Sequence, residues 1–198
     1  MDLGIPQLFA SVALVADRDH YHLVQRALRA ARVSVWIGTA NVKEMMVEAP
    51  IGTRARARDR YVSVLATLEQ LARSGVELRL LHAGQPSRPF REELGRRRGL
   101  VAPHFEMRQC PRVHFKLLAV DGALLYVGSA NFTGAGLGAK GEGRRNFELG
   151  VLTDDERLLD AVQARFDRIW SGGECTGCLL RAHCPRPLDH GGRRRHED

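Results

Sequence analysis

Residues 113–131 combine the side-chain types that bind and cleave a phosphodiester. His114 and Lys116 are separated by one residue, and Ser129 and Asn131 repeat that spacing further along the chain. An imidazole has a pKa near neutrality, so it can act as a nucleophile or as a proton donor. An ammonium and a carboxamide can donate hydrogen bonds to phosphate oxygens as negative charge builds in the transition state. These residue types indicate phosphoryl chemistry.

The polar residues lie at the ends of two short apolar segments that predict adjacent β-strands. Asp121-Gly122 separates the segments, and this dipeptide favours a tight hairpin turn. Because side chains alternate between the faces of a strand, His114 and Lys116 are expected on the same face. Gly128 is expected to let the backbone approach a substrate closely. The hairpin therefore predicts that the imidazole, ammonium, hydroxyl and carboxamide lie at the ends of adjacent strands.

The spacing of these residues resembles the signature of the phospholipase D superfamily, which is H-x-K, four residues, D, six residues and G-S-x-N. The chain matches it at every position: His114, Lys116, Asp121, Gly128, Ser129 and Asn131. The superfamily also carries a downstream glutamate, and Glu148 stands where that residue is expected. The alternative interpretation is that these polar residues lie on a hairpin by chance and have no catalytic function. So many matched positions together favour the functional interpretation.

The resemblance implies cleavage in two steps. One His114 would attack phosphorus to form a phosphohistidine while a second histidine protonates the leaving oxygen, and water would then attack with that second histidine as base. Lys116 and Asn131 would hold the phosphate oxygens, Ser129 would donate a further hydrogen bond, and Glu148 would orient an imidazole. Charged groups would replace a catalytic divalent metal, so activity should survive EDTA unless chelation strips a structural metal.

This scheme needs two histidines, whereas the chain contains a single H-x-K motif. Two copies must therefore meet, and we predict a two-fold symmetric homodimer in which both His114 residues enter one pocket on the axis. His20 and His22 lie at an expected helix start and are interpreted as surface or capping residues. Asp121, at the turn, is expected to be structural rather than chemical.

Length and composition predict one globular domain with short extensions. Hydrophobic residues make up 44% of the 198 residues, which argues against wholesale disorder. Lys and Arg number 30 against 23 Asp and Glu, and the net charge of +7 favours an anionic polymer or surface as partner. No apolar run is long enough to span a bilayer and no signal peptide is recognisable, so a cytoplasmic protein without a membrane partner is expected.

Nucleic acid, either DNA or RNA, is the substrate that this composition favours. The chain is short and basic, its excess charge is mostly arginine, and only 6% of its residues are aromatic. It looks similar to the small single-motif endonucleases of the superfamily. Hydrolysis of phospholipid or cardiolipin is one alternative, and a non-catalytic nucleic-acid-binding module is another.

The remaining sequence predicts an α/β fold of the phospholipase D type, with a mixed, largely parallel sheet flanked by helices on both faces. Strands are expected over residues 33–39, 76–82, 104–109 and 147–153. Helices are expected from Asp17 or Asp19 to about Ala31, up to Ser74 before a capping Gly75, and from a capping box at residues 153–156 to Trp170. Strand, helix and strand in this order predict a parallel βαβ unit.

Two other segments are predicted to be less regular. Residues 1–16 indicate a helix or an extended arm. Residues 83–99 are rich in proline, glycine and charge and predict a long loop with a helical turn around residues 90–94. That loop is either a solvated excursion or a phosphate-tracking flap. We assign residues 1–172 to the catalytic domain and residues 173–198 to a cysteine-containing extension with a basic tail.

Four cysteines predict a metal site outside the catalytic motif. Cys175, Cys178 and Cys184 form a C-x2-C-x5-C cluster, and Cys110 is the remaining cysteine. Without an export signal, metal binding is favoured over disulfides. The arrangement is similar to the iron-staple nucleases of helicase–nuclease complexes, where one upstream cysteine and a C-terminal C-x2-C-x5-C hold a [4Fe–4S] cluster.

That resemblance implies a structural [4Fe–4S] cluster that clamps the C-terminal tail to the segment before His114. Structural zinc, with His183 able to replace one cysteine, is the first alternative. Unliganded cysteines are the second.

Overall fold

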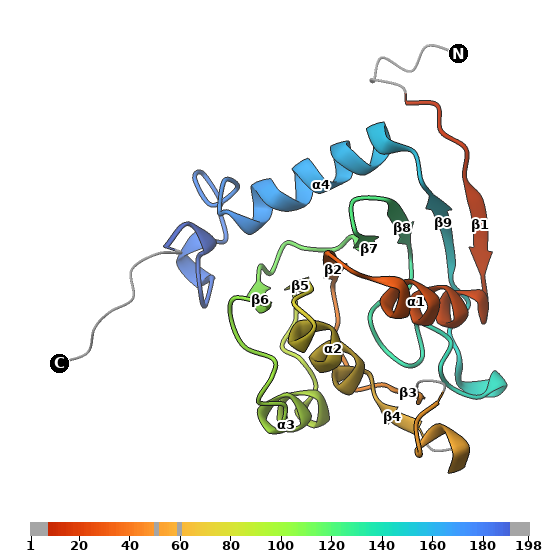
Figure 1. The fold of residues 1–198 in the computed structure, drawn as a ribbon. Coiled ribbons are helices and arrows are strands. Elements are labelled where there is room, and N and C mark those ends of the chain that lie inside the picture. Colours follow the sequence, from red (N-terminus) through yellow and green to blue (C-terminus); the bar gives the residue numbers. More distant parts are fainter. Residues whose placement is uncertain (1–7, 50–51, 59–60, 191–198) are drawn as a thin grey trace.

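The computed structural model describes residues 8–49, 52–58 and 61–190, and its central element is a seven-stranded sheet (Figure 1). Residues 191–198, the basic end of the expected tail, lie outside the described part. The sheet order is β1-β9-β8-β7-β2-β5-β6, and β3 and β4 form a separate hairpin. The strands are β1 (Ala13–Ala16), β2 (Ser34–Thr39), β3 (Met46–Glu48), β4 (Tyr61–Ser63), β5 (Glu77–His82), β6 (Phe105–Gln109), β7 (Lys116–Val120), β8 (Leu124–Gly128) and β9 (Leu149–Thr153).

Four α-helices accompany the sheet: α1 (Asp19–Ala30), α2 (Val64–Arg73), α3 (Arg88–Arg96) and α4 (Glu156–Trp170). Short 3-10 turns occupy Arg56–Arg58, Glu142–Arg144, Arg181–His183 and Leu188–His190. Within the described residues, no helix combines the length and the apolar character needed to cross a bilayer.

Antiparallel pairing dominates the sheet, which corrects the expectation of a largely parallel one. The pairs β1–β9, β9–β8, β8–β7 and β7–β2 are antiparallel, and only β2–β5 and β5–β6 are parallel. The mixed α/β fold and the parallel β2–α2–β5 unit are confirmed. The strands that follow β6 are joined without crossover helices, and such connections give antiparallel neighbours.

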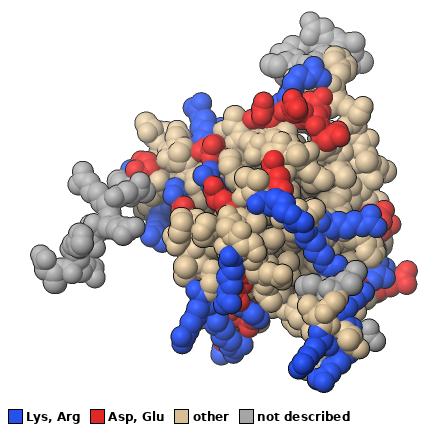
Figure 2. All heavy atoms as spheres, viewed as in Figure 1, with Lys and Arg blue, Asp and Glu red and all other residues tan. Residues whose placement is uncertain are grey.

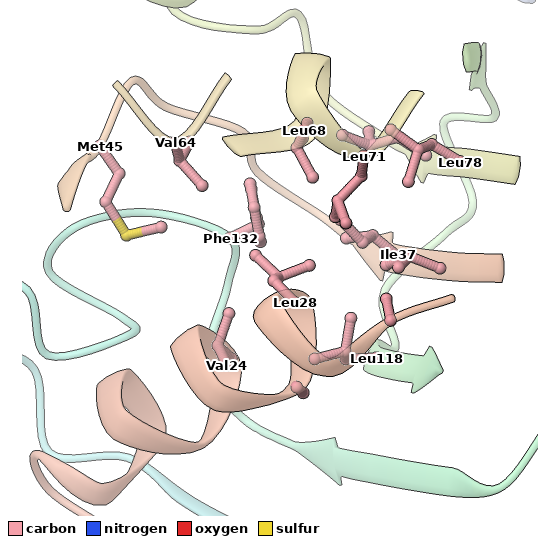
Figure 3. Close-up of a cluster of buried hydrophobic side chains, with 14 of the residues drawn as sticks. Val24, Leu28, Ile37, Met45, Val64, Leu68, Leu71, Leu78, Leu118 and Phe132 are labelled. Carbon is pink, nitrogen blue, oxygen red and sulfur yellow. The ribbon is translucent and has the colours of Figure 1, made fainter. Parts of the chain in front are cut away.

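Both faces of the sheet are buried, as expected. On one face, α1 and α2 enclose the larger core, whose members include Val24, Leu28, Ile37, Leu68, Leu71, Leu118 and Phe132 (Figure 3). On the other face, α4 packs Phe166 between Trp36 and Trp170, with ring centroids 5.1 and 5.6 Å apart. Every residue of β7 is buried between these layers. An all-apolar strand such as Leu117–Val120 is the sequence pattern that burial on both faces requires.

Local signals located most elements to within one or two residues. The bounds of α1, α2, β2, β5, β6 and β9 match the expected ranges closely. Gly75 follows α2 with a φ of 87°, the left-handed conformation expected of a C-terminal glycine. At α4 the expected capping box is replaced by a single cap, because the Asp155 carboxylate accepts the Leu158 N–H at 3.0 Å.

Within the segment 83–99, residues Arg88–Arg96 form the helix α3, where the sequence predicted a loop with only a helical turn around residues 90–94. Ser87 caps the N-terminus of α3, Pro89 occupies its first turn, and Phe90 is fully buried. Arg88 and Arg96 form ion pairs with Glu92 and Glu93 one turn away. These pairs neutralise arginines that the flap interpretation assigned to phosphate, so the contacts favour a structural segment.

The described part of the expected N-terminal arm, residues 8–16, is extended, and residues 1–7 lie outside the described residues. β1 is an edge strand on β9, and the segment before it is tied down by two hydrogen bonds. The Thr153 hydroxyl donates to the Ser11 carbonyl at 2.7 Å, and Arg157 Nη2 donates to the Phe9 carbonyl at 2.8 Å.

Asp121 ties the β7–β8 turn to the start of β2. Its carboxylate accepts the backbone N–H groups of Arg32, Val33 and Ser34 at 2.9, 2.8 and 2.8 Å. Burial alone would raise the pKa of Asp121, but these three donors outweigh it and hold the pKa below its usual value. A φ of 55° at Asp121 forms the tight turn. Asp121 therefore has a structural role.

Replacing Asp121 by Asn should lower the free energy of unfolding by about 1.5–3 kcal/mol, because the charge-assisted hydrogen bonds are weakened while Asn tolerates the positive φ. The native pKa lies below the unfolded one, so this contribution is present above the unfolded pKa and is lost as pH falls through the native pKa. Urea unfolding at several pH values measures both effects. Asp160→Asn, at an exposed site on α4, is the control; equal losses in the two variants would contradict this role.

Candidate active site

The motif residues meet at one edge of the sheet. β2 ends at this edge and β7 begins there, because the two strands are antiparallel. β8 ends and β9 begins at the same edge for the same reason. Lys116 opens β7, Ser129 follows β8 and Glu148 precedes β9. The topology thus brings side chains from distant parts of the sequence together, at the edge where β2 and β5 present their carboxyl ends, a frequent ligand-binding position in α/β proteins.

His114 and Lys116 are in contact. The His114 side chain is exposed just before β7, while Lys116 is only 9% exposed. Lys116 Nζ donates to the His114 carbonyl at 2.8 Å and lies 3.3 Å from His114 Nδ1. The ammonium therefore covers Nδ1. For Nε2 to act as a nucleophile, Nδ1 must carry the ring proton, so Lys116 has to turn from Nδ1 towards the substrate.

Asn131 is oriented by two residues that the sequence analysis missed. Its side-chain oxygen accepts the Asn41 N–H at 3.0 Å and lies 3.2 Å from the Thr39 hydroxyl. The Thr39 hydroxyl also accepts the Phe132 N–H at 3.0 Å. With its oxygen engaged, Asn131 has its NH2 group left to donate to an anion. Polar residues at the end of a buried strand and just after it were the available signal for Thr39 and Asn41.

The backbone around Asn131 is fixed by packing. Phe132 is buried between α1 and α2 (Figure 3) and pairs with Val42 in an isolated parallel bridge. A Cβ atom at Gly136 would lie 2.6 Å from the Asn131 carbonyl oxygen, so only glycine lets the following loop fold back this closely. Asn131 therefore stands on a rigid base.

Gly128 is required by a neighbouring side chain. A Cβ at Gly128 would lie 2.3 Å from the Tyr126 hydroxyl oxygen, and one at Gly150 would lie 2.4 Å from the Tyr126 ring. Gly128 and Gly150 are direct partners across β8 and β9. The structure thus gives Gly128 a packing requirement, and the expected close approach of substrate stays a prediction.

Ser129 and Glu148 form the other side of the site. The Ser129 hydroxyl donates to the Glu148 carboxylate and accepts the Leu149 N–H at 3.1 Å. Asn146 Nδ2 donates to the same carboxylate at 3.0 Å. Glu148 is thereby held beside Ser129, and it makes no hydrogen bond to His114 within the described chain.

His20 is buried, which corrects the expectation of a surface or capping residue; His22 is exposed as expected. The His20 ring lies edge-on to Tyr126, with centroids 5.5 Å apart and Nδ1 3.5 Å from the phenol oxygen. Burial lowers the pKa of His20 and raises the pKa of Tyr126 to about 12. Both side chains are therefore neutral near pH 7. Tyr126 packs against Gly128 and Gly150, and His20 packs against Tyr126.

The four cysteines line a separate cavity of about 90 Å³. Burial raises the pKa of the Cys110 thiol, whereas the Leu180 N–H and the Arg112 guanidinium hold the pKa of Cys178 below its usual value. His183 is exposed and is not part of the cavity wall. Among the described His, Cys, Asp and Glu residues, no group of three or more has the geometry to hold a single metal ion.

Residues 24–170 match the sequence profile of a family described as "Cardiolipin synthase, PLD-like domain". The chain belongs to this family. The superfamily resemblance of the motif is thus confirmed, and together with the site it supports a phosphodiesterase-type enzyme in general. The matched region ends before Cys175, so it does not bear on the cysteine cluster. A comparison with curated proteins finds no match.

Solved structures share the fold. NucT from Helicobacter pylori has a TM-score of 0.55 and 14% identity, over 81% of this chain and 95% of that one. Nuc from Salmonella typhimurium, a phospholipase D family member, has a TM-score of 0.52 and 17% identity, over 82% and 95%. Phosphatidylserine synthase from Haemophilus influenzae has a TM-score of 0.50 and 13% identity, over 80% and 38%. At these identities the likeness concerns the fold alone.

Replacing Thr39 by Val should lower turnover about 10- to 100-fold, because the Asn131 amide loses a partner that orients it. The buried Phe132 N–H also loses its acceptor, so the free energy of unfolding should fall by about 1–3 kcal/mol. Steady-state kinetics and urea unfolding measure the two effects. Thr67→Val, at a buried position on α2, is the control; unchanged turnover in Thr39→Val would show that Asn131 needs no such support.

Proposed function

We propose that the chain is an endonuclease that cleaves DNA or RNA through a phosphohistidine, without a catalytic divalent metal. The observation that carries this proposal is the convergence of His114, Lys116, Ser129 and Asn131 at one sheet edge, with the Asn131 oxygen already engaged. A nucleophile, a cation and an amide donor at one edge of a sheet are the groups that phosphoryl transfer requires.

The proposed reaction begins when a phosphate oxygen draws Lys116 away from His114. His114 Nε2 then attacks phosphorus, the P–O bond to the leaving nucleoside breaks, and a second imidazole gives that oxygen a proton. Lys116 and Asn131 stabilise the five-coordinate transition state through its non-bridging oxygens. In the second step the now neutral second imidazole takes a proton from water, which attacks phosphorus and breaks the P–N bond.

The second imidazole is proposed to be His114 of the partner subunit in a symmetric homodimer. Within the described chain, His82 also ends its strand at this edge, but its ring is buried and its Nδ1 is 2.8 Å from the Gly84 carbonyl oxygen. Burial lowers the pKa of His82, so it resists the protonation that a general acid needs. His20 is likewise buried, and His104 precedes β6 at the opposite end of the parallel strands.

Exposed apolar side chains next to the site support the dimer. Phe147 and Leu149 flank Glu148 and are 99% and 61% exposed, and Leu14 on the neighbouring edge strand is 72% exposed. Contiguous apolar surface of this kind marks protein interaction sites. An interface over β1 and β9 would place the partner beside Ser129 and Glu148, and a partner's imidazole would give Glu148 a group to orient.

Basic side chains on the segments bordering the site support a nucleic-acid substrate. Lys43, Lys140 and Arg144 are exposed, and none forms an ion pair with a carboxylate of the described residues. Lys140 also lines a polar cavity of about 350 Å³ together with Arg18 and Arg145. Figure 2 also shows Lys and Arg side chains over α3 and the β3–β4 hairpin, but Arg88 and Arg96 of α3 are paired with carboxylates. Exposed cations without a carboxylate partner among the described residues, such as Lys43, Lys140 and Arg144, attract a polyanion.

A phospholipid is the second candidate substrate. The family description names a cardiolipin synthase, and one of the similar folds is a phosphatidylserine synthase. The same His114 chemistry acts on either phosphodiester. The substrate class is therefore decided by assay.

Wild-type protein should cleave labelled DNA or RNA in EDTA, and His114→Ala should lose at least about 10³-fold in rate, because the nucleophile is gone. His104→Ala, at an exposed histidine outside the site, should retain full activity. Vesicles of phosphatidylglycerol and cardiolipin form the parallel substrate arm. Hydrolysis of vesicles alone would identify phospholipid, and not nucleic acid, as the substrate. Nucleolytic activity that persists in His114→Ala would refute the proposal that this chain cleaves nucleic acid through His114.

Leu14→Glu should weaken the dimer at least about 100-fold, because a charge would be buried in an apolar interface, and activity should fall with it. Sedimentation velocity measures the association. Val101→Glu replaces a similarly exposed apolar residue that lies before β6 and should leave the dimer intact. A fully active Leu14→Glu monomer would count against the shared site.

A further inference from the structure

The cavity lined by the four cysteines joins three parts of the chain that are distant in sequence. Residues 109–113, which lead into the catalytic motif, form one wall, and Arg165 and Ile169 near the end of α4 form another. The tail from Glu174 to Leu188 closes the rest. Every cysteine of the chain lies on this one cavity, and none of the four forms a disulfide. Thiols brought together from separate segments without bonding to each other are a donor set for a metal centre.

The surroundings of the thiols suit thiolate ligands. Arg112 and Leu180 line the cavity together with the four cysteines. Arg165 and Arg181 also line the cavity, although each forms an ion pair, with Glu174 and Asp189 respectively. Cationic groups and N–H donors around sulfur stabilise the negative charge of a thiolate-bound cluster and tune its potential.

We propose that this cavity holds a [4Fe–4S] cluster ligated by Cys110, Cys175, Cys178 and Cys184. A cluster is favoured over zinc, because zinc needs its ligands gathered about 2.1–2.3 Å around a single ion, and no three of the described His, Cys, Asp and Glu residues have the geometry to hold one ion. A proline follows both Cys110 and Cys184, as it follows the last cysteine in bacterial ferredoxin motifs. The proposal is independent of the substrate of the catalytic site.

Ligation would fix the segment that delivers His114. The Cys110 N–H donates to the His82 carbonyl at 2.8 Å, and the Val113 N–H donates to the Cys110 carbonyl at 3.0 Å. Val113 is buried in one apolar cluster with Leu188 of the tail and Trp170 of α4. The [4Fe–4S] cluster would thus join the C-terminal tail to the segment that ends at His114. The four cysteine ligands would then be positioning residues for the nucleophile.

Iron and acid-labile sulfide are measured in the full chain purified without oxygen and, in parallel, after reconstitution with ferrous iron and sulfide. The expected result is about four iron and four sulfide ions per chain, together with an absorption band at roughly 400 nm that weakens on reduction. Cys178→Ala should lose the iron, whereas His183→Ala should keep it. One zinc per chain, or no iron after reconstitution, overturns the proposal. The metal content of the wild-type protein decides between these outcomes, so the test does not depend on whether the Cys178→Ala variant folds.

The coupling to the nucleophile is read by hydrogen exchange, which needs no substrate. Removing the cluster with a chelator under oxidising conditions should raise amide exchange in residues 110–114 at least about tenfold, while residues 77–80 in the central β5 strand should be unchanged. Unchanged amide exchange at residues 110–114 would contradict the claim that the metal site positions the segment before His114.

Discussion

The antiparallel pairing of β7 with β2 and β8 is the constraint on which the site depends. A Cβ at Gly38 would lie 2.3 Å from the Phe115 ring, so glycine is required where β2 faces its partner Leu117 on β7. A slip of one residue would carry Lys116 to the opposite face of the sheet. Asp121 holds the far end of the same hairpin against β2. The position of the His114–Lys116 pair is therefore set by backbone register and ring packing more than by contacts within the site.

The two halves of the site are supported from opposite faces of the sheet. Asn131 is anchored through Phe132, which is buried in the core beneath α1 and α2. His114 is anchored through Val113, which is buried in the cluster beneath α4. A change in either layer moves one half of the site relative to the other. The cysteine cavity adjoins only the α4 layer, so a metal centre there would act on the nucleophile and leave the Asn131 side unaffected.

Sequence reasoning identified what depends on local signals and missed what depends on distant partners. The spacing from His114 to Asn131 is a short-range pattern, and it located the motif, its hairpin and the structural role of Asp121. The direction in which the strands pair and the burial of His20 depend on contacts between distant segments, and the expectations of a largely parallel sheet and of a surface or capping His20 both failed. The length of α3 was underestimated as a single turn because its arginines and proline resemble a loop, whereas Phe90 and the ion pairs to Glu92 and Glu93 stabilise a helix. Thr39 and Asn41 carry no motif of their own, and only the folded edge shows that they orient Asn131.

Subunit mixing tests the central claim, that two His114 side chains act in one pocket, most directly. Wild-type and His114→Ala chains are allowed to exchange subunits at several ratios, and nuclease activity is measured against the fraction of wild-type chains. If each site needs both imidazoles, activity follows the square of that fraction and an equal mixture retains roughly a quarter of it. A linear decline, with roughly half of the activity in the equal mixture, would contradict the shared site and would make each chain a complete enzyme.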